Sequence, residues 1–302
     1  MNTKFKFITL LAIALFLFSA CGRGATPAPS GKLRVLATNS IVGDVVGQVG
    51  GDYITLSLLM PLGTDPHDYV PRPQDATALA DAQIIFANGA GLEASLQPLF
   101  DSTGATSKLV EVSNGITLLQ LPGSNQSTGD PHTWMDPNNV LIWTQNILTA
   151  LSTADPSHAA VYQANAKAYD TSLHDLDTWI RSEVAQIPAQ NRLLVSDHAV
   201  LGYFAVQYGF TQVGSITGSF SSEAAPSAKE VAALEVKIRQ TGARAVFVSE
   251  AANQALADQI ASDTGIRTIW IYHATLTTPG GPVPTYLDFM RYNVNAIVGA
   301  LK

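Results

Sequence analysis

The hydrophobic residues of this chain recur with two periods, one typical of β-strands and one of α-helices. Short apolar runs rich in Val, Ile, Leu and Phe predict strands over 33–39, 54–60, 83–88, 108–113, 192–197, 211–216, 244–250 and 267–273. Between them, apolar residues three and four positions apart predict helices, for example over 40–50, 72–82 and 227–242. This alternation predicts βαβ units, and hence an α/β fold with two mainly parallel sheets flanked by helices.

The longest helical pattern lies between the two series of strands. From Pro156 to Gln186, apolar and aromatic side chains recur at helical spacing among several alanines, and Pro188 then ends the pattern. We therefore expect two lobes joined by one long helix. The expected boundaries are 32–155 for the first lobe, 156–188 for the linking helix and 189–302 for the second lobe. The halves look alike in architecture, but no repeated sequence indicates a duplication.

The start of the chain predicts an export signal. Lys4 and Lys6 precede an apolar run over 7–18, which is shorter than the roughly 20 residues of a membrane-spanning helix. Small residues then precede Cys21, the only cysteine, as in the lipobox of bacterial lipoproteins. We expect removal of residues 1–20, with acyl chains on Cys21 holding the protein to the outer side of the cell membrane. The alternatives are an ordinary cleaved signal and an uncleaved anchor.

Composition narrows the range of partners. Residues 21–31 lack apolar periodicity and predict a flexible tether. The chain has 302 residues, of which 46% are hydrophobic and 14% charged, so it does not resemble a disordered protein. Its net charge of −7 and the absence of a long basic run argue against nucleic acid as a partner.

Four of the six histidines follow predicted strands or the loops after them. His67 follows the turn after 54–60, His132 ends a polar loop, His198 comes directly after a strand, and His273 ends the last strand. In open α/β sheets, ligands bind beyond the carboxyl ends of the strands. Imidazole is the commonest metal-binding side chain, and four imidazoles could close a tetrahedral shell around zinc. The alternative is four unrelated, hydrogen-bonded loop residues.

The segments around these histidines resemble those of one protein family. They are PLGTDPHDYVPRPQD (61–75), DPHTWMDPNNV (130–140), DHAVLGYFAVQYGF (197–210) and, near the end of the chain, TYLDFMRYNVNAIVGAL (285–301). In this order they resemble the metal-binding lipoproteins of bacterial zinc and manganese ABC importers, which are solute-binding proteins with a rigid linking helix. The resemblance implies metal capture between two α/β lobes, and delivery to a membrane permease served by a cytoplasmic ATPase.

The resemblance also implies a set of ligands. His67, His132 and His198 match three ligand positions of the family. The fourth position usually carries an aspartate, and here His273 lies at or next to it, so we expect His273 to be the fourth ligand. Four acids flank these histidines and are expected to orient the imidazoles and offset the charge of the ion. They are Asp65, Asp68, Asp130 and Asp197.

The ligand atoms predict the metal. Nitrogen donors suit Zn²⁺, whereas Mn²⁺ favours oxygen donors, so we expect zinc as the transported cargo and manganese as the alternative. The loop over 118–130 lacks the histidine- and acid-rich insertion that zinc-specific members often carry. We expect a monomer that binds metal without catalysis, and movement of the loops carrying His198 and His273 on release.

Three other functions compete with this interpretation. A zinc-dependent hydrolase would need an open coordination position, and the chain has neither His-Glu-x-x-His nor Gly-x-Ser-x-Gly. A solute-binding protein for an organic ligand would leave the histidines without a role. The resemblance also allows an adhesin, although no particular residue supports one.

Overall fold

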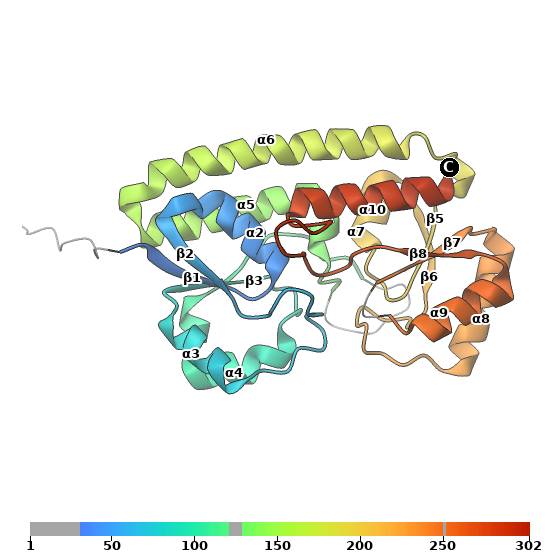
Figure 1. Cartoon of the computed structure of the whole chain (residues 1–302), viewed down its shortest axis with the longest axis horizontal. Helices are drawn as coiled ribbons and strands as arrows, with labels where there is room; N and C mark the ends of the chain where they lie inside the picture. Colours follow the sequence, from blue (N-terminus) through green and yellow to red (C-terminus); the bar gives the residue numbers. More distant parts are fainter. Residues whose placement is uncertain (1–30, 121–128, 250–251) are drawn as a thin grey trace, which may run out of the picture. The chain divides into compact units, whose positions relative to one another are not determined.

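The computed structural model describes residues 31–120, 129–249 and 252–302 (Figure 1). Residues 33–302 form one compact unit. The expected signal, Cys21 and all of the expected tether except Gly31 lie outside the described residues. Among the residues described, no helix is both long enough and apolar enough to cross a membrane.

Two parallel sheets follow the same plan. The strand order is β2-β1-β3-β4 in the first sheet and β6-β5-β7-β8 in the second, so the two lobes repeat one topology. The strands are β1 Leu33–Ala37, β2 Ile54–Leu58, β3 Ile84–Ala87, β4 Leu109–Glu111, β5 Leu193–Ser196, β6 Thr211–Ser215, β7 Ala245–Val248 and β8 Arg267–Trp270. Each lies within a strand predicted from the sequence. The prediction of two parallel α/β sheets is confirmed.

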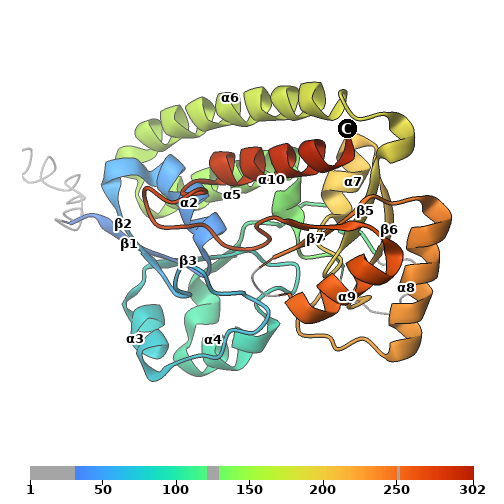
Figure 2. The ribbon, with the colours of Figure 1, turned by 45° about the vertical axis from the view of Figure 1, so that its right-hand side comes forward.

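Helices flank both sheets. They are α2 Ser40–Gly50, α3 Pro73–Asp81, α4 Gln97–Thr103, α5 Pro137–Ala154, α6 Ala159–Val184, α7 Gly202–Tyr208, α8 Ala228–Thr241, α9 Gln254–Thr264 and α10 Tyr286–Leu301. The long helix between the lobes is α6, which follows a 3₁₀ turn at Pro156–His158. It packs against α2, α5 and α10, and it runs alongside α10 in both views (Figures 1 and 2).

Helix α5 was not among the helices predicted from the sequence. Its start carries strong signals, because the Asp136 side chain accepts a hydrogen bond from the Asn138 N–H and Pro137 occupies the first turn. Its buried residues Val140, Trp143, Ile147 and Leu151 also recur at helical spacing. The helix was missed because it breaks the alternation of strands and helices, as it follows β4 and leads directly into α6.

One apolar core continues from the first sheet to the second. Its main cluster joins Phe86 of β3, Trp143 of α5, Leu176 of α6, Phe247 of β7 and Phe289 of α10. Smaller clusters lie under α3 and α4 in the first lobe, and under α8 and α9 in the second. Buried apolar surface stabilises a fold by about 25 cal/mol per Å². Separating the sheets would expose this shared core, so the helical layer holds both lobes in a fixed arrangement.

Asp177, on α6, fastens the linking helix to its neighbours. Its carboxylate accepts hydrogen bonds from Asn138 of α5 at 3.2 Å and from the Tyr208 hydroxyl of α7 at 2.9 Å. It also pairs with Arg181 at 2.8 Å. Burial by itself raises the pKa of Asp177, but the hydrogen bonds from Arg181 and Tyr208 outweigh it and leave the pKa below its usual value.

Replacing Asp177 by alanine is expected to lower the free energy of unfolding by about 2 kcal/mol at pH 7, because Tyr208 and Asn138 lose a charged acceptor. The pKa of Asp177 is lower in the folded protein than the value of 3.8 in the unfolded chain, so its carboxylate stabilises the folded protein above pH 3.8. This contribution is lost as the pH falls through the pKa of Asp177 in the folded protein. Denaturant unfolding should therefore show that the difference in the free energy of unfolding between the wild type and Asp177→Ala becomes smaller below pH 4. Arg181→Ala removes a half-exposed ion pair and should cost at most about 1 kcal/mol; equal losses for both variants would contradict the role of Asp177.

Candidate metal centre

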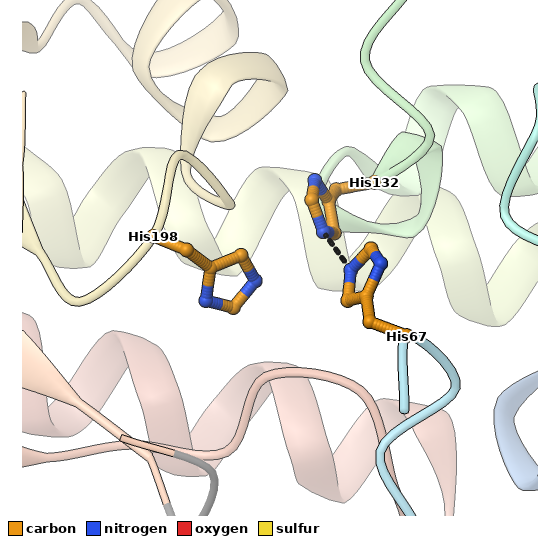
Figure 3. Close-up of side chains that lie close together, drawn as sticks. All are labelled: His67, His132 and His198. Atoms are coloured by element: carbon orange, nitrogen blue, oxygen red, sulfur yellow. Dashed lines mark hydrogen bonds between the residues drawn. The ribbon is translucent and has the colours of Figure 1, made fainter. Parts of the chain in front are cut away.

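Three histidine side chains meet beyond the strand ends of the two sheets (Figure 3). His67 follows β2, His132 begins the 3₁₀ turn Thr133–Met135, and His198 follows β5. Each offers a ring nitrogen within 4.8 Å of the others, and the Nε2 atoms of His67 and His132 lie 3.1 Å apart. Two nitrogens bound to one tetrahedral zinc ion lie roughly 3.3 Å apart. The observed spacing is therefore close to that of two ligands on a shared ion.

His273 belongs to a second group beside the first. Together with Asp197 and His198 it offers ligand atoms within 4.8 Å of one another. Its ring centroid lies 5.0 Å from that of His198, which belongs to both groups, so the four imidazoles form one continuous cluster. His273 is 3% exposed, and neither its Nε2 atom nor that of His198 has a hydrogen-bond partner among the described residues. Buried polar atoms are normally paired, so these nitrogens are available to a ligand.

Asp130 and Asp197 orient the rings. Asp130 Oδ1 accepts a hydrogen bond from the His132 backbone N–H at 2.9 Å and lies 2.7 Å from Nδ1 of the same residue. Asp197 Oδ1 lies 2.9 Å from His198 Nδ1 and 3.1 Å from His273 Nδ1. An ionised carboxylate that accepts a hydrogen bond from Nδ1, as Asp197 does at His198, fixes the tautomer and leaves Nε2 free to bind a metal.

The other two acids of the predicted set have different surroundings. Asp65 Oδ1 accepts the backbone N–H of His67 at 2.9 Å, and its Oδ2 accepts the Ser222 hydroxyl at 2.7 Å. Ser222 lies on the loop between β6 and α8, so this contact joins the two lobes beside the site. Asp68 is exposed, and it lines a pocket together with Asp65 and His273.

Several residues that support the site were missed in the sequence. A Cβ atom at Gly202 would lie 2.5 Å from Asp130 Oδ2, so glycine leaves room for this carboxylate. The Tyr203 hydroxyl donates to the Asp130 carbonyl at 2.9 Å, and Ser249 donates to Asp197 through both its N–H and its hydroxyl at 3.0 Å. These residues act through contacts distant in sequence, for which hydrophobic periodicity provides no signal.

Burial keeps His67 and His132 neutral in the metal-free protein. It lowers the pKa of His67 to about 4 against the opposing charge of Asp65, and it lowers the pKa of His132 well below the usual value. Burial also raises the pKa of Asp130 to about 8, although the His132 backbone N–H opposes this. At neutral pH, Asp130 therefore holds a proton and His132 is a neutral imidazole. Neutral imidazole is the form that binds metal, so the cluster is prepared for a cation.

Asp197 keeps its negative charge. Burial alone would raise its pKa, but His273 and His198 outweigh this effect and hold the pKa well below its usual range. With metal on His132 Nε2, Nδ1 becomes the donor to an ionised Asp130. Two buried carboxylates would then offset the charge of a divalent cation held by neutral rings.

The variant His67→Gln is expected to reduce the pH dependence of stability of the metal-free protein. Between pH 6.5 and about 4, the unfolded chain binds a proton on His67 that the folded chain excludes. The wild type therefore loses up to about 1.4 kcal/mol per pH unit from this residue as the pH falls. Glutamine does not titrate, so unfolding of chelator-treated protein at pH 7, 6 and 5 should show a shallower slope. His174→Gln, at an exposed position of α6, is the control and should keep the wild-type slope. Equal slopes for wild type and His67→Gln would mean that His67 is not kept neutral.

The sequence and the fold of the chain are similar to those of known metal-binding proteins. Residues 35–300 match the family described as zinc-uptake complex component A, periplasmic. The chain is 32% identical to the manganese-binding lipoprotein MntA of Halalkalibacterium halodurans, over 99% of this chain and 98% of that protein. It is 30% identical to the manganese ABC transporter substrate-binding lipoprotein PsaA of Streptococcus pneumoniae, over 99% of both chains.

Solved structures have the same fold. The Mn-bound periplasmic metal-binding protein of Candidatus Liberibacter asiaticus superposes with a TM-score of 0.81 at 27% identity, over 90% of this chain and 100% of that one. The periplasmic zinc-binding protein TroA of Treponema pallidum superposes with a TM-score of 0.82 at 26% identity, over 90% and 99% of the two chains. The similar proteins thus include both manganese and zinc binders.

Proposed function

Because the chain belongs to the periplasmic zinc-uptake component A family, the solute-binding proteins of metal ABC importers, we propose that it captures zinc outside the cytoplasm and delivers it to a membrane permease. Proteins of this family bind metal and are not enzymes, so the hydrolase alternative is set aside. Anchoring through Cys21 and a monomeric state are part of the proposal. The observation that carries it is the buried cluster of His67, His132 and His198.

The proposed ligand set has three core members and one flanking member. His67, His132 and His198 bind the ion through nitrogens that already lie within 4.8 Å of one another. His273 completes the shell by a small movement of its ring from the group that it forms with Asp197 and His198. Asp130 and Asp197 hold the rings through Nδ1 and supply negative charge close to the ion.

Metal titration of the purified protein tests this function. We expect one tightly bound Zn²⁺ per wild-type chain, and a loss of affinity of more than about 100-fold in His132→Ala, because a fully buried ligand is removed. His174→Ala removes an exposed histidine from α6 and should bind as the wild type does. Unchanged affinity in His132→Ala would remove this residue from the site, and a wild type without metal uptake would refute the function.

The preference for zinc rests on the donor atoms. The cluster offers imidazole nitrogens, which suit Zn²⁺ better than Mn²⁺. Asp197 is ionised, but its oxygens already accept hydrogen bonds from His198 and Ser249, which favours an orienting role over direct coordination. Manganese is the second candidate, because the similar lipoproteins MntA and PsaA are named for manganese.

The variant His273→Asp is expected to shift the choice of metal toward Mn²⁺, since an oxygen donor replaces a nitrogen donor. Competitive titration should show the ratio of Zn²⁺ to Mn²⁺ affinity falling by about 10-fold or more relative to the wild type. His273→Asn is the control, because it has the same size without the negative charge. A wild type that prefers Mn²⁺ would refute the choice of zinc, and an unchanged ratio in His273→Asp would argue against His273 as a ligand.

Release requires a ligand to move, and the two second-lobe histidines are held differently. The Trp134 indole N–H donates to the His273 carbonyl at 2.8 Å, and the Gly63 N–H donates to the Thr275 hydroxyl at 2.8 Å. Both donors belong to the first lobe, so the backbone of the His273 segment is tied to that lobe. We therefore propose that release involves the His198 side, whereas the sequence had led us to expect that both loops adjust.

A further inference from the structure

A pocket of about 220 Å³ opens beside the histidine cluster. Its walls include Asp65, Asp68, Ser249 and His273. Asp68 is exposed, Asp65 is half-buried and His273 is 3% exposed. Two carboxylates and a buried imidazole thus line one pocket, with burial increasing from the solvent toward the cluster.

The His273 imidazole that lines this pocket has a nitrogen without a hydrogen-bond partner among the described residues. Nε2 of His273 is buried and has no hydrogen-bond partner among the residues the structure describes. A buried nitrogen without a partner is costly unless a ligand satisfies it. Since His273 also contacts the His198 ring, an ion bound in the pocket would reach the cluster through this residue.

On other sides, aromatic and polar side chains pack against the histidine cluster. The ring of buried Phe220 lies 6.3 Å from that of His132, and Trp134 packs edge-on against the same ring at 5.2 Å. Ser222 also donates to Asp65 across the two lobes. Phe220 and Ser222 both belong to the loop that joins β6 to α8, so this loop contacts the cluster on that side.

A larger pocket of about 400 Å³ is the rival route. It is lined by that loop and the start of α9, and it includes Asp197 and Glu223. It meets the cluster at Asp197, whose oxygens already accept hydrogen bonds from His198 and Ser249. The smaller pocket instead includes His273, whose Nε2 has no hydrogen-bond partner among the described residues.

We propose that the smaller pocket is the path by which a divalent cation enters, and that Asp68 at its exposed end attracts the ion first, with the nearby negative charge of Asp65 adding to the attraction. The proposal rests on the proposed function of metal capture. A hydrated cation is attracted by carboxylates, which are hard oxygen donors, before it sheds water and passes to imidazole. Negative charge at the mouth of a pocket also raises the association rate. Asp68 therefore acts mainly on the rate of capture, and the histidines act on retention.

Stopped-flow mixing of Zn²⁺ with chelator-treated protein tests the path. Trp134 packs against His132, so its fluorescence reports arrival of the ion at the cluster. We expect Asp68→Asn to slow association by about 10-fold at low ionic strength, with a smaller effect in high salt. Asp68→Glu keeps the charge and should restore the rate. Dissociation, measured by adding a chelator to the loaded protein, should change far less than association.

Glu223→Gln provides the matched control, because it removes the same charge from an exposed position in the rival pocket. Association at the wild-type rate in this variant supports the proposed path. Slower association in Glu223→Gln than in Asp68→Asn would place entry in the larger pocket. Equal slowing of association in both variants would mean that only the net charge matters, which would overturn the proposed path. Association at the wild-type rate in Asp68→Asn would also overturn it. These outcomes leave equilibrium zinc binding by the wild type intact, whereas a wild type that takes up no zinc would refute the function itself.

Discussion

The shared apolar core is the constraint on which the rest of this structure depends. Each parallel sheet is a simple four-stranded unit, and neither sheet alone carries the complete histidine cluster. The layer of α5, α6 and α10 packs against both sheets, so their functional loops are held within ångströms of each other. A site built from both lobes needs this fixed distance, because ligand nitrogens must stay within a few ångströms to share an ion.

The fixed arrangement also allows an unfavourable concentration of polar groups. Three imidazoles and two carboxylates lie buried together beside the half-buried His67, where charged forms are poorly solvated. The protein responds by excluding the additional proton from His67 and His132, by keeping a proton on Asp130, and by keeping Asp197 ionised. The metal-free site therefore offers neutral imidazoles at His67 and His132 and a negative charge at Asp197, which is an environment suited to a divalent cation.

The four acids around the cluster have different roles, which follow from their positions. Asp130 and Asp197 contact ring nitrogens and are buried, Asp65 fixes the His67 loop and reaches across to Ser222, and Asp68 faces solvent. A carboxylate in water attracts cations without holding them strongly, whereas a buried imidazole cluster holds them through directed bonds. Placing oxygen donors outside and nitrogen donors inside separates the speed of capture from the strength of binding.

The sequence by itself determined the α/β class, every strand of both sheets and the long helix, because periodic burial is recorded locally in the order of the residues. Its resemblance to a known family also selected the histidines that the structure brings together. Only the tertiary structure decided that His273 groups with Asp197 and His198 rather than with His67 and His132, that Trp134 ties its backbone to the first lobe, and that the four acids have different roles. These features depend on contacts between residues far apart in the chain, which are set by how α5, α6 and α10 pack the two lobes together.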